Sequence, residues 1–301
     1  MTIERLRGIV AAAATPVTED CAIDEARLVE HCARLLRIGC DGINLLGTTG
    51  EATSFSTEQR LRAMEAVARS GLPLDRVMVG TGAAALADSV RLTAAARDLG
   101  FAGALLLPPF YYKGIDDDSL VAYVETVIAR LGAAGLRLYL YHFPQNSGVP
   151  YSVAAVERLH RAHPEQVLGL KDSSGDLAYA AELTCRMPGL DVFPSAEGAL
   201  AMAREHGFAG CISATANITA PLAAKAWRAL GTESGAKAVA AAAALRAAFT
   251  ASPLIAGVKW ALADRYGDAT WTRLCPPLRA LTAEEQRALR TRLDATDYPA
   301  L

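Results

Sequence analysis

One lysine stands inside an otherwise apolar run in the middle of the chain. Lys171 belongs to Val167–Ser174, where Leu168-Gly169-Leu170 precede it and favour a buried strand. Burial disfavours the ammonium form of a lysine, and the neutral amine adds to carbonyl groups to give a Schiff base. The alternative is a lysine at a strand end whose ammonium group reaches solvent. The pattern by itself leaves both interpretations open.

A tyrosine on the preceding strand offers a second reactive group. Tyr141 lies in the predicted strand Leu136–Pro144, and a tyrosine hydroxyl can donate and accept a proton. On the strand beside Lys171 it would lie within reach of an imine. Tyr139 shares its strand face because side chains alternate with period two, so a core role is the alternative for either tyrosine.

A turn of small residues follows the second predicted strand and reads Gly47-Thr48-Thr49-Gly50-Glu51. Small residues let backbone N–H groups approach an anion, and a substrate carboxylate fits such a turn. A strand-to-helix turn in which a threonine caps the helix is equally consistent with the sequence.

Short apolar runs alternate with longer amphipathic segments, and these are the elements that must position the reactive groups. The predicted strands are Gly8–Val17, Gly42–Gly47, Arg76–Gly82, Gly103–Pro109, Leu136–Pro144, Val167–Ser174, Leu190–Glu197 and Gly210–Ile218. The predicted helices between them include Asp24–Ile38, Thr57–Ser70, Asp88–Leu99, Asp118–Leu131 and Ser152–Arg161. Ser56 and Gln59 have the spacing of a capping box, and glycines close four of the helices at positions 39, 71, 100 and 132.

Eight strand–helix units with strands apolar on both faces predict a parallel sheet covered by helices, closed into a (β/α)8 TIM barrel. An open doubly wound sheet would need a glycine-rich phosphate turn where the sequence reads Ala14-Thr15-Pro16. In a barrel the strand carboxyl ends form the active site, so Lys171, Tyr141 and Thr48 are expected to meet there.

The last seventy or so residues predict a C-terminal helical extension rather than a further repeat. We expect the barrel in residues 1–231 and helices packed on it in residues 232–301. These helices are Glu233–Thr250, Pro253–Tyr266 and Ala283–Ala295. The alanine-rich run Ala238–Ala248 favours a closely packed helix over a role in ligand binding.

Composition limits the classes of function. With 52% hydrophobic residues the 301-residue chain can bury a large core, and its net charge of −2 favours neither nucleic acid nor an anionic membrane as partner. The six cysteines form no CxxC pair and predict neither disulfides nor a metal site. Neither a signal peptide nor a membrane span is expected, which predicts a cytoplasmic protein.

The motifs taken together resemble the dihydrodipicolinate synthase and N-acetylneuraminate lyase family over nearly the whole chain. Their order makes the likeness specific, and no single motif would do so. The motifs are GTTGE at Gly47–Glu51, PPFYY at Pro108–Tyr112, YHFPQNSGV at Tyr141–Val149, GLKDSSGD at Gly169–Asp176, CISATANI at Cys211–Ile218 and VKWAL at Val258–Leu262.

The resemblance implies roles for individual residues. Lys171 matches the Schiff-base lysine, Tyr141 the tyrosine that shuttles protons, and Thr48 the hydroxyl that relays between this tyrosine and a second one. Tyr111 matches the second tyrosine, which family members insert into the site of the neighbouring subunit. Thr49 matches the residue that binds the carboxylate of pyruvate.

The resemblance also implies the surroundings of these groups. Ile212 matches the residue whose backbone carbonyl faces the lysine, and we expect Gly47 and Ser195 to help bind substrate. The family is typically a tetramer built as a dimer of dimers. We expect neither a metal nor an organic cofactor, because the protonated imine supplies the electrophile.

One departure from the family pattern bears on the substrate. Synthases that condense pyruvate with aspartate semialdehyde carry an arginine where this sequence has Asn146, and an amide cannot form a charged bidentate clamp. We therefore expect an aldolase acting on a 2-keto-3-deoxy sugar acid or a 4-hydroxy-2-oxoglutarate type of substrate. The alternatives are 4-hydroxy-tetrahydrodipicolinate synthase, a dehydratase of 2-keto-3-deoxy sugar acids, and a non-catalytic barrel that binds sugar acids.

The remaining polar residues predict structural roles. His142 alternates away from Tyr141 and should pack against a covering helix. The acidic run at 116–118 should cap the helix that follows it, and Glu51 should cap or pair near the site. The other histidines are expected at the surface, at positions 31, 160, 163 and 206.

Overall fold

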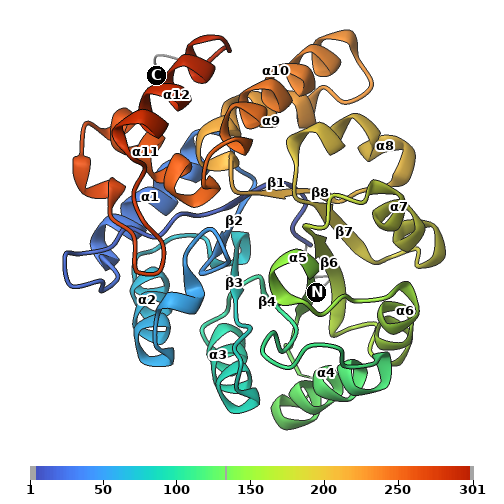
Figure 1. The fold of residues 1–301 in the computed structure, drawn as a ribbon. Coiled ribbons are helices and arrows are strands. Elements are labelled where there is room, and N and C mark those ends of the chain that lie inside the picture. The colour runs from blue at the N-terminus through green and yellow to red at the C-terminus, as the bar shows by residue number, and fades with distance from the viewer. Residues whose placement is uncertain (1–4, 133, 299–301) are drawn as a thin grey trace.

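The computed structural model describes residues 5–132 and 134–298, and these form the predicted (β/α)8 barrel (Figure 1). All strand pairs are parallel, and the order β7-β6-β5-β4-β3-β2-β1-β8 returns almost to its start. The N–H of Ala209 donates to the carbonyl of Val192 at 2.9 Å and links the two end strands. The strands are β1 (Gly8–Ala12), β2 (Gly42–Leu45), β3 (Val77–Gly80), β4 (Gly103–Leu106), β5 (Leu138–His142), β6 (Val167–Asp172), β7 (Asp191–Pro194) and β8 (Gly210–Ser213).

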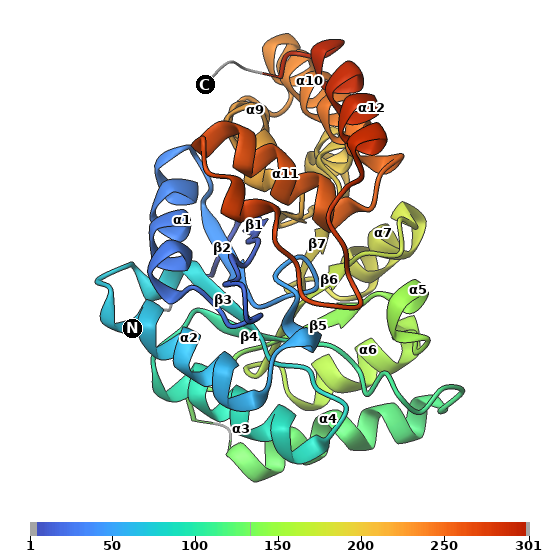
Figure 2. The same ribbon diagram turned by 60° about the vertical axis from the view of Figure 1, so that its left-hand side comes forward.

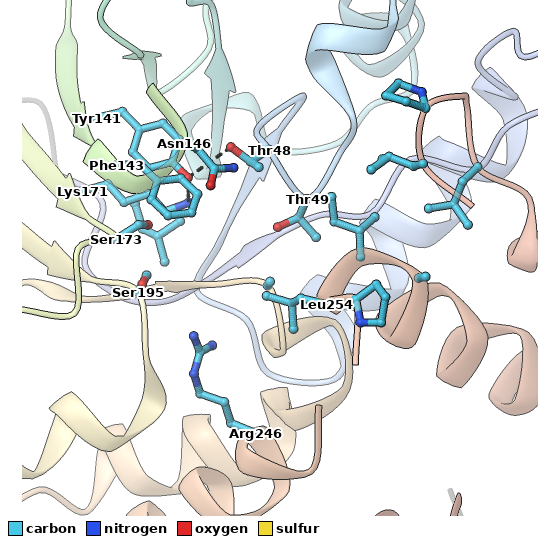
Figure 3. A pocket seen from close by; sticks show the side chains of 18 of the residues that line it. Thr48, Thr49, Tyr141, Phe143, Asn146, Lys171, Ser173, Ser195, Arg246 and Leu254 are labelled. Carbon is cyan, nitrogen blue, oxygen red and sulfur yellow. Dashed lines mark hydrogen bonds between the residues drawn. The ribbon is translucent and has the colours of Figure 1, made fainter. Parts of the chain in front are cut away.

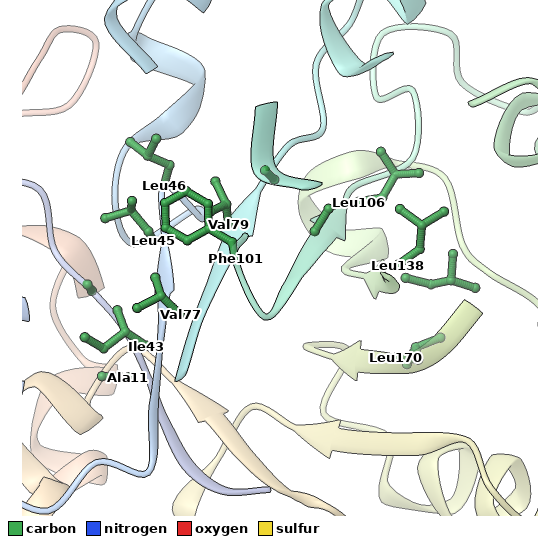
Figure 4. Close-up of a cluster of buried hydrophobic side chains, with 14 of the residues drawn as sticks. Ala11, Ile43, Leu45, Leu46, Val77, Val79, Phe101, Leu106, Leu138 and Leu170 are labelled. Carbon is green, nitrogen blue, oxygen red and sulfur yellow. The ribbon is translucent and has the colours of Figure 1, made fainter. Parts of the chain in front are cut away.

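Every strand residue is buried, as expected for a sheet covered on both faces. One set of side chains fills the barrel interior and includes Met78, Tyr139 and Phe193. A larger set lies between the strands and the surrounding helices, and Figure 4 shows part of it around Ile43 and Val77. The apolar runs of the sequence therefore form the barrel wall, and its two faces form two packed layers.

The five predicted helices, which follow the first five strands, lie close to their predicted positions. Ser56 and Gln59 form the predicted capping box, and all four helix-closing glycines have positive φ angles. The helices up to the sixth strand are α1 (Glu25–Arg37), α2 (Thr57–Arg69), α3 (Leu86–Asp98), α4 (Asp117–Leu131), α5 (Pro144–Ser147) and α6 (Val153–Ala162).

The structure differs from the sequence prediction after the sixth strand. Three helices in this part of the chain were not predicted: α7 (Leu177–Arg186), the short α8 (Ala203–His206) and α9 (Ala216–Arg228). The four-residue α5 after the fifth strand was not predicted either. The eighth strand was predicted to continue to Ile218, but α9 has begun by then. The side-chain amide of Asn217 donates to the carbonyls of Ala12 and Ala214, and these bonds fix the turn from strand to helix.

Each strand also ends before its predicted end, because its last predicted residues leave the sheet to form the loops at the barrel mouth. The prediction therefore assigned residues of the active-site face to regular structure. Loops at this face carry the binding and catalytic groups of barrel enzymes.

The C-terminal extension consists of α10 (Glu233–Thr250), α11 (Leu254–Tyr266) and α12 (Ala283–Asp294). Figures 1 and 2 show the three helices together on one side of the barrel, beside α1 and α9. A core of their own, which includes Leu245, Phe249 and Leu289, joins them to the barrel through Ala14 and Ile218. Among the described residues no single helix is long and apolar enough to span a membrane. The pair α10 and α11 reaches that length and apolarity only when the two helices are taken together, and they meet at a bend of 112°.

Candidate active site

Lys171 and Tyr141 lie side by side at the carboxyl ends of their strands. They are register partners across β5 and β6, and only 3% of the lysine and 4% of the tyrosine are exposed. Nζ of Lys171 donates to the hydroxyl of Tyr141 at 3.3 Å and lies 4.3 Å from the centre of the tyrosine ring. None of the carboxylates in the described ranges forms an ion pair with this lysine. Tyr139, the other tyrosine of the strand face, packs edge-on against Phe193 in the barrel core.

Thr48 extends this contact to a third group. Its hydroxyl lies 3.2 Å from the hydroxyl of Tyr141, which therefore contacts both the threonine and the lysine (Figure 3). The turn that carries Thr48 is bounded by two non-glycine residues with positive φ, Leu46 at 52° and Glu51 at 55°. Such angles are unfavourable for side chains other than glycine and concentrate at functional sites.

A cavity of about 630 Å³ opens above these groups at the barrel mouth. Lys171 and the two threonines of the turn face it, together with Asn146, Ser195 and Ile212, so the structure brings seven of the nine predicted site residues to one space (Figure 3). The full set of predicted residues on its wall is Thr48, Thr49, Tyr141, Asn146, Lys171, Ser195 and Ile212.

The other two predicted residues, Gly47 and Tyr111, lie elsewhere. Gly47 lines a second cavity of about 210 Å³ that also touches Thr48, Tyr141 and Asn146. A Cβ atom at Gly47 would stand 2.4 Å from Nδ2 of Asn44, so a side chain here would require Asn44 to move. Tyr111 is 73% exposed on the loop after β4. It does not line the cavity that holds Lys171.

Arg246 of α10 lines the larger cavity and was missed by the sequence analysis. Its Nη1 donates to the hydroxyls of Ser213 and Thr215, both at 3.1 Å, and lies 3.5 Å from the carboxylate of Glu197. Glu197 is fully buried and accepts hydrogen bonds from Ser213, Thr215 and Thr219. The arginine is partly exposed to the cavity and points towards Ser195 (Figure 3).

The run Ala238–Ala248 was predicted to pack closely, and the structure shows in addition that its Arg246 lines the cavity. A signal was available, because Arg246 is the one charged residue between Ala238 and Thr250. A charge that interrupts an otherwise apolar helix needs a polar environment.

Residues of the extension form a large part of the cavity wall. They come from the end of α10, the start of α11 and the loop before α12, and all but the two arginines present apolar or backbone atoms. These residues are Arg246, Pro253, Leu254, Ile255, Ala256, Leu274, Pro277, Leu278 and Arg279. The site is thus built by the barrel and the extension together.

Two of the structural predictions are confirmed beside the site. His142 points away from the cavity, stacks on Tyr179 of α7 at 4.4 Å between ring centres, and accepts the N–H of Tyr151 at 3.0 Å. Burial lowers the pKa of His142 to about 4. The side chain of Asp116 caps α4 by accepting from the N–H of Ser119.

The surface prediction was wrong for His31, which is 2% exposed. Its ring nitrogens contact the hydroxyl of Tyr266 at 2.7 Å and Oδ1 of Asn217 at 2.8 Å. Burial lowers its pKa to about 4. Its partners come from α9 and α11, so the error arose from packing that short-range pattern does not encode. The other three histidines are partly exposed.

An α/β barrel with a buried lysine and a tyrosine at the strand ends defines a class of barrel enzymes in which catalysis sits at this face. The chain belongs to the dihydrodipicolinate synthetase family, whose model matches residues 5–296. Its members are carbon–carbon lyases, so this protein is an enzyme of that kind. Its reaction belongs to the class of pyruvate-dependent aldolases and lyases.

Two relatives and one solved structure give the range of the likeness. The chain is 36% identical over 292 residues to an uncharacterized DapA-like lyase of Chloroflexus aurantiacus, covering 94% of this chain and 95% of the relative. It is 34% identical over 235 residues to the 4-hydroxy-tetrahydrodipicolinate synthase of Acidiphilium cryptum, covering 74% and 75%. The crystal structure of dihydrodipicolinate synthase from Agrobacterium tumefaciens has a TM-score of 0.88 at 29% identity, covering 96% and 99%.

Proposed function

We propose that the protein is a class I aldolase that forms a Schiff base between Lys171 and the C2 carbonyl of a 2-oxo acid with pyruvate as one component. The observation that carries the proposal is the contact chain from Nζ of Lys171 to the hydroxyl of Tyr141 and on to Thr48, at 3.3 and 3.2 Å. It joins a nucleophile to a proton-transfer group at the floor of one cavity.

In this reaction the amine of Lys171 adds to C2, and loss of water leaves a protonated imine. The imine accepts the electron pair of the C3–C4 bond when this bond breaks, and an enamine results. Tyr141 donates its proton to the C2 hydroxyl that leaves as water, and the resulting phenolate takes the proton of the C4 hydroxyl as the aldehyde forms. Thr48 hydrogen-bonds to the tyrosine oxygen throughout. Protonation of the enamine at C3 and hydrolysis of the imine release pyruvate and the free lysine.

The turn and the opposite wall give the substrate its orientation. The backbone N–H of Thr49 would bind the carboxylate of the 2-oxo acid. The backbone carbonyl of Ile212 would face the lysine from another side of the cavity. Asn146 and Ser195 offer neutral polar groups to hydroxyls further along the substrate. Gly47 keeps the backbone of the turn close to the site, where a side chain would collide with Asn44.

The acceptor half of the substrate should match the polar groups across the cavity. Arg246 lines this region and contacts the carboxylate of Glu197 at 3.5 Å, and its remaining N–H groups are suited to hold a substrate carboxylate. A 4-hydroxy-2-oxo acid with a second carboxylate, of the 4-hydroxy-2-oxoglutarate type, therefore fits best. A 2-keto-3-deoxy sugar acid would instead use Asn146 and Ser195 for its hydroxyls.

A second candidate is 4-hydroxy-tetrahydrodipicolinate synthase, which joins pyruvate to aspartate semialdehyde. The synthase of Acidiphilium cryptum is one relative, and Arg246 is a cation that could meet the carboxylate of the semialdehyde from the opposite wall. Asn146 argues against this activity because it removes the charge expected beside Tyr141. The two candidates differ in which acceptor gives the highest kcat/KM.

The decisive experiment treats the protein with pyruvate and borohydride, which reduces an imine to a stable amine. Peptide mapping should find the added mass on Lys171. The other lysines serve as internal controls, and an adduct on Lys113 or Lys259, or none at all, would overturn the mechanism. Pyruvate with a panel of aldehydes, including aspartate semialdehyde and glyoxylate, then ranks the acceptors. A semialdehyde that ranks first would select the synthase.

We also propose that Tyr111 completes the site of a neighbouring subunit. Its side chain is exposed, and the second cavity lies against Thr48 and Tyr141, with an apolar wall that includes Leu105 and Leu107. A cavity of about 210 Å³ with this lining suits an aromatic ring. A dimer would then be the smallest complete unit, and the tetramer of the family two such dimers.

Mixing two variants tests this assembly. Lys171→Ala removes the nucleophile and Tyr111→Phe removes the proposed distal hydroxyl, so each homodimer should turn over slowly. A hybrid dimer pairs one intact lysine with an intact Tyr111 from the other chain, and activity should return in part. If subunit exchange is verified and no activity returns, Tyr111 does not act across the interface.

A further inference from the structure

A second lysine, Lys259 of α11, forms an ion pair with Glu51 that is completely buried. Its Nζ lies 2.6 Å from Oε1 of Glu51, and neither side chain has any exposed surface. The same Nζ donates to the carbonyl of Thr15 at 2.9 Å, and Oε2 of Glu51 accepts the backbone N–H of Cys275 at 2.9 Å. Each oxygen of the carboxylate therefore has its own donor, one from α11 and one from the loop that follows.

Stability alone is a weak reason for such an arrangement. Removing two charges from water costs as much as their attraction returns, and an apolar pair of similar volume is often as stable. Burial lowers the pKa of Lys259, and Glu51 opposes this shift without cancelling it. Glu51 also has a left-handed backbone conformation, with φ at 55°. Desolvation and backbone strain at one residue, next to a candidate active site, indicate a positioning role.

A continuous line of contacts joins this ion pair to the nucleophile. The backbone N–H of Glu51 donates to the carbonyl of Thr48 at 3.0 Å. The hydroxyl of Thr48 lies 3.2 Å from that of Tyr141, which accepts from Lys171 at 3.3 Å. We propose that Lys259 and Glu51 are positioning residues that hold the Thr48–Thr49 turn where it can serve the imine at Lys171. This inference rests on the proposed function of that lysine.

The same contacts tie the C-terminal extension to the chemistry. Lys259 belongs to α11, whose first residues line the cavity, and Cys275 precedes Pro277 and Leu278, which also line it. If this wall moved, the movement would be transmitted to the turn through Lys259 and Cys275, the two residues that donate to the carboxylate of Glu51. The described part of the extension, residues 232–298, is thus part of the catalytic unit and does more than cover the barrel.

Variants can separate positioning from stability. Lys259→Met keeps the volume but leaves Glu51 as an unpaired buried charge, so it should lower both Tm and activity. The double variant Glu51→Leu/Lys259→Met has no unpaired charge and should regain much of the lost Tm. It still lacks the link to the turn, so its activity should stay low.

The readout is exchange of the methyl protons of pyruvate in D2O, followed by NMR, because it reports enamine formation without any acceptor. We expect the double variant to exchange about a hundredfold more slowly than the wild type, the loss typical of misplacing a catalytic group by about 1 Å. Exchange within threefold of the wild type, at a recovered Tm, would overturn the inference.

Glu51→Asp provides a second test that does not depend on the folding of the double variant. It keeps both charges and shortens the link by one methylene, so the turn or the lysine must move. Exchange should fall at least tenfold, and an unchanged rate would contradict a positioning role.

A matched control lies at the opposite end of the barrel. Asp191 begins β7, is 1% exposed and pairs with Arg7 at 2.6 Å. Asp191→Asn should lower Tm and leave the exchange rate unchanged, because this face of a barrel serves stability. If the wild type itself exchanges no protons of pyruvate, the proposed function fails; if the wild type and the double variant exchange alike, only the positioning role fails.

Discussion

Two lysines are buried in this barrel, and their surroundings are opposite. Lys171 is 3% exposed, faces the cavity, donates to the hydroxyl of Tyr141 and lies over its ring. Lys259 has no exposure, faces away from the cavity and is held by a carboxylate and a backbone carbonyl. Both are isolated lysines in apolar sequence, yet only one of them has space for a substrate beside its amine.

The contrast shows what distinguishes a reactive lysine from a structural one. Burial is common to both, so burial does not identify the nucleophile. The carboxylate of Glu51 pairs directly with Lys259, whereas Lys171 has Tyr141 beside it, which can exchange protons. Access to a cavity and the lack of a fixed counter-charge are therefore the features that set Lys171 apart.

The largest expected effect follows from replacing Lys171 with methionine. Lys171→Met should reduce turnover by at least about a thousandfold, because the covalent step has no other nucleophile. Its Tm should stay the same or rise, since the variant replaces a buried polar amine that has no carboxylate partner with an apolar side chain. Steady-state kinetics and thermal unfolding of the same preparation measure both quantities.

Lys259→Met should show the opposite sign in stability. It leaves Glu51 buried and unpaired, which costs about 3–5 kcal/mol. Chemical denaturation gives this difference directly. A fall in stability for Lys171→Met that matches that of Lys259→Met would show that the two lysines have the same structural role.

The next effect concerns the proton-transfer group beside Lys171. Tyr141→Phe keeps the ring under the lysine and removes the hydroxyl that contacts both Lys171 and Thr48. Turnover should fall by about a hundredfold to ten-thousandfold, the usual contribution of general acid–base catalysis. Borohydride should still trap the adduct with pyruvate on Lys171, although more slowly. Loss of trapping together with normal folding would mean that the tyrosine is needed to form the imine itself.

The sequence was sufficient for the features that depend on neighbouring residues. Short apolar runs that alternate with amphipathic helical segments predicted the barrel. The apolar run around Lys171 made this lysine a candidate nucleophile, and the structure places it in the cavity. Tyr141 could be placed beside it because adjacent parallel strands align their carboxyl ends. These inferences need only local pattern and the geometry of a closed parallel sheet.

Contacts between distant segments could not be predicted in this way. Glu51 and Lys259 are 208 positions apart, and His31 and Asn217 are separated by 186. Their pairing depends on how α11 and α9 dock on the barrel, which no short-range pattern specifies. Arg246 was missed for the same reason, since an alanine-rich helix indicates close packing but not which of its residues reaches the cavity.

The smallest effect on turnover is expected at His142, which adjoins Tyr141 on β5 but faces α7. Tyr141 and His142 are thus neighbours on one strand, the first proposed as reactive and the second as structural. Nδ1 of His142 accepts the N–H of Tyr151 at 3.0 Å, so protonation removes this acceptor, and burial lowers the pKa of the imidazole to about 4. Between this value and 6.5, the unfolded chain binds more protons than the folded protein, and stability falls as the pH falls.

From pH 7 to pH 5 the contribution of His142 to unfolding free energy should therefore decrease by about 2 kcal/mol. His142→Asn removes the titrating group and can still present an oxygen to Tyr151, so urea unfolding should show a smaller decrease over this range. His31, whose pKa is also about 4, is present in both proteins and cancels in the difference. kcat at pH 7 should change by less than about threefold, because the imidazole faces away from the cavity. An equal pH dependence of stability in both proteins would contradict the lowered pKa of His142. A large loss of kcat would place His142 among the reactive groups instead.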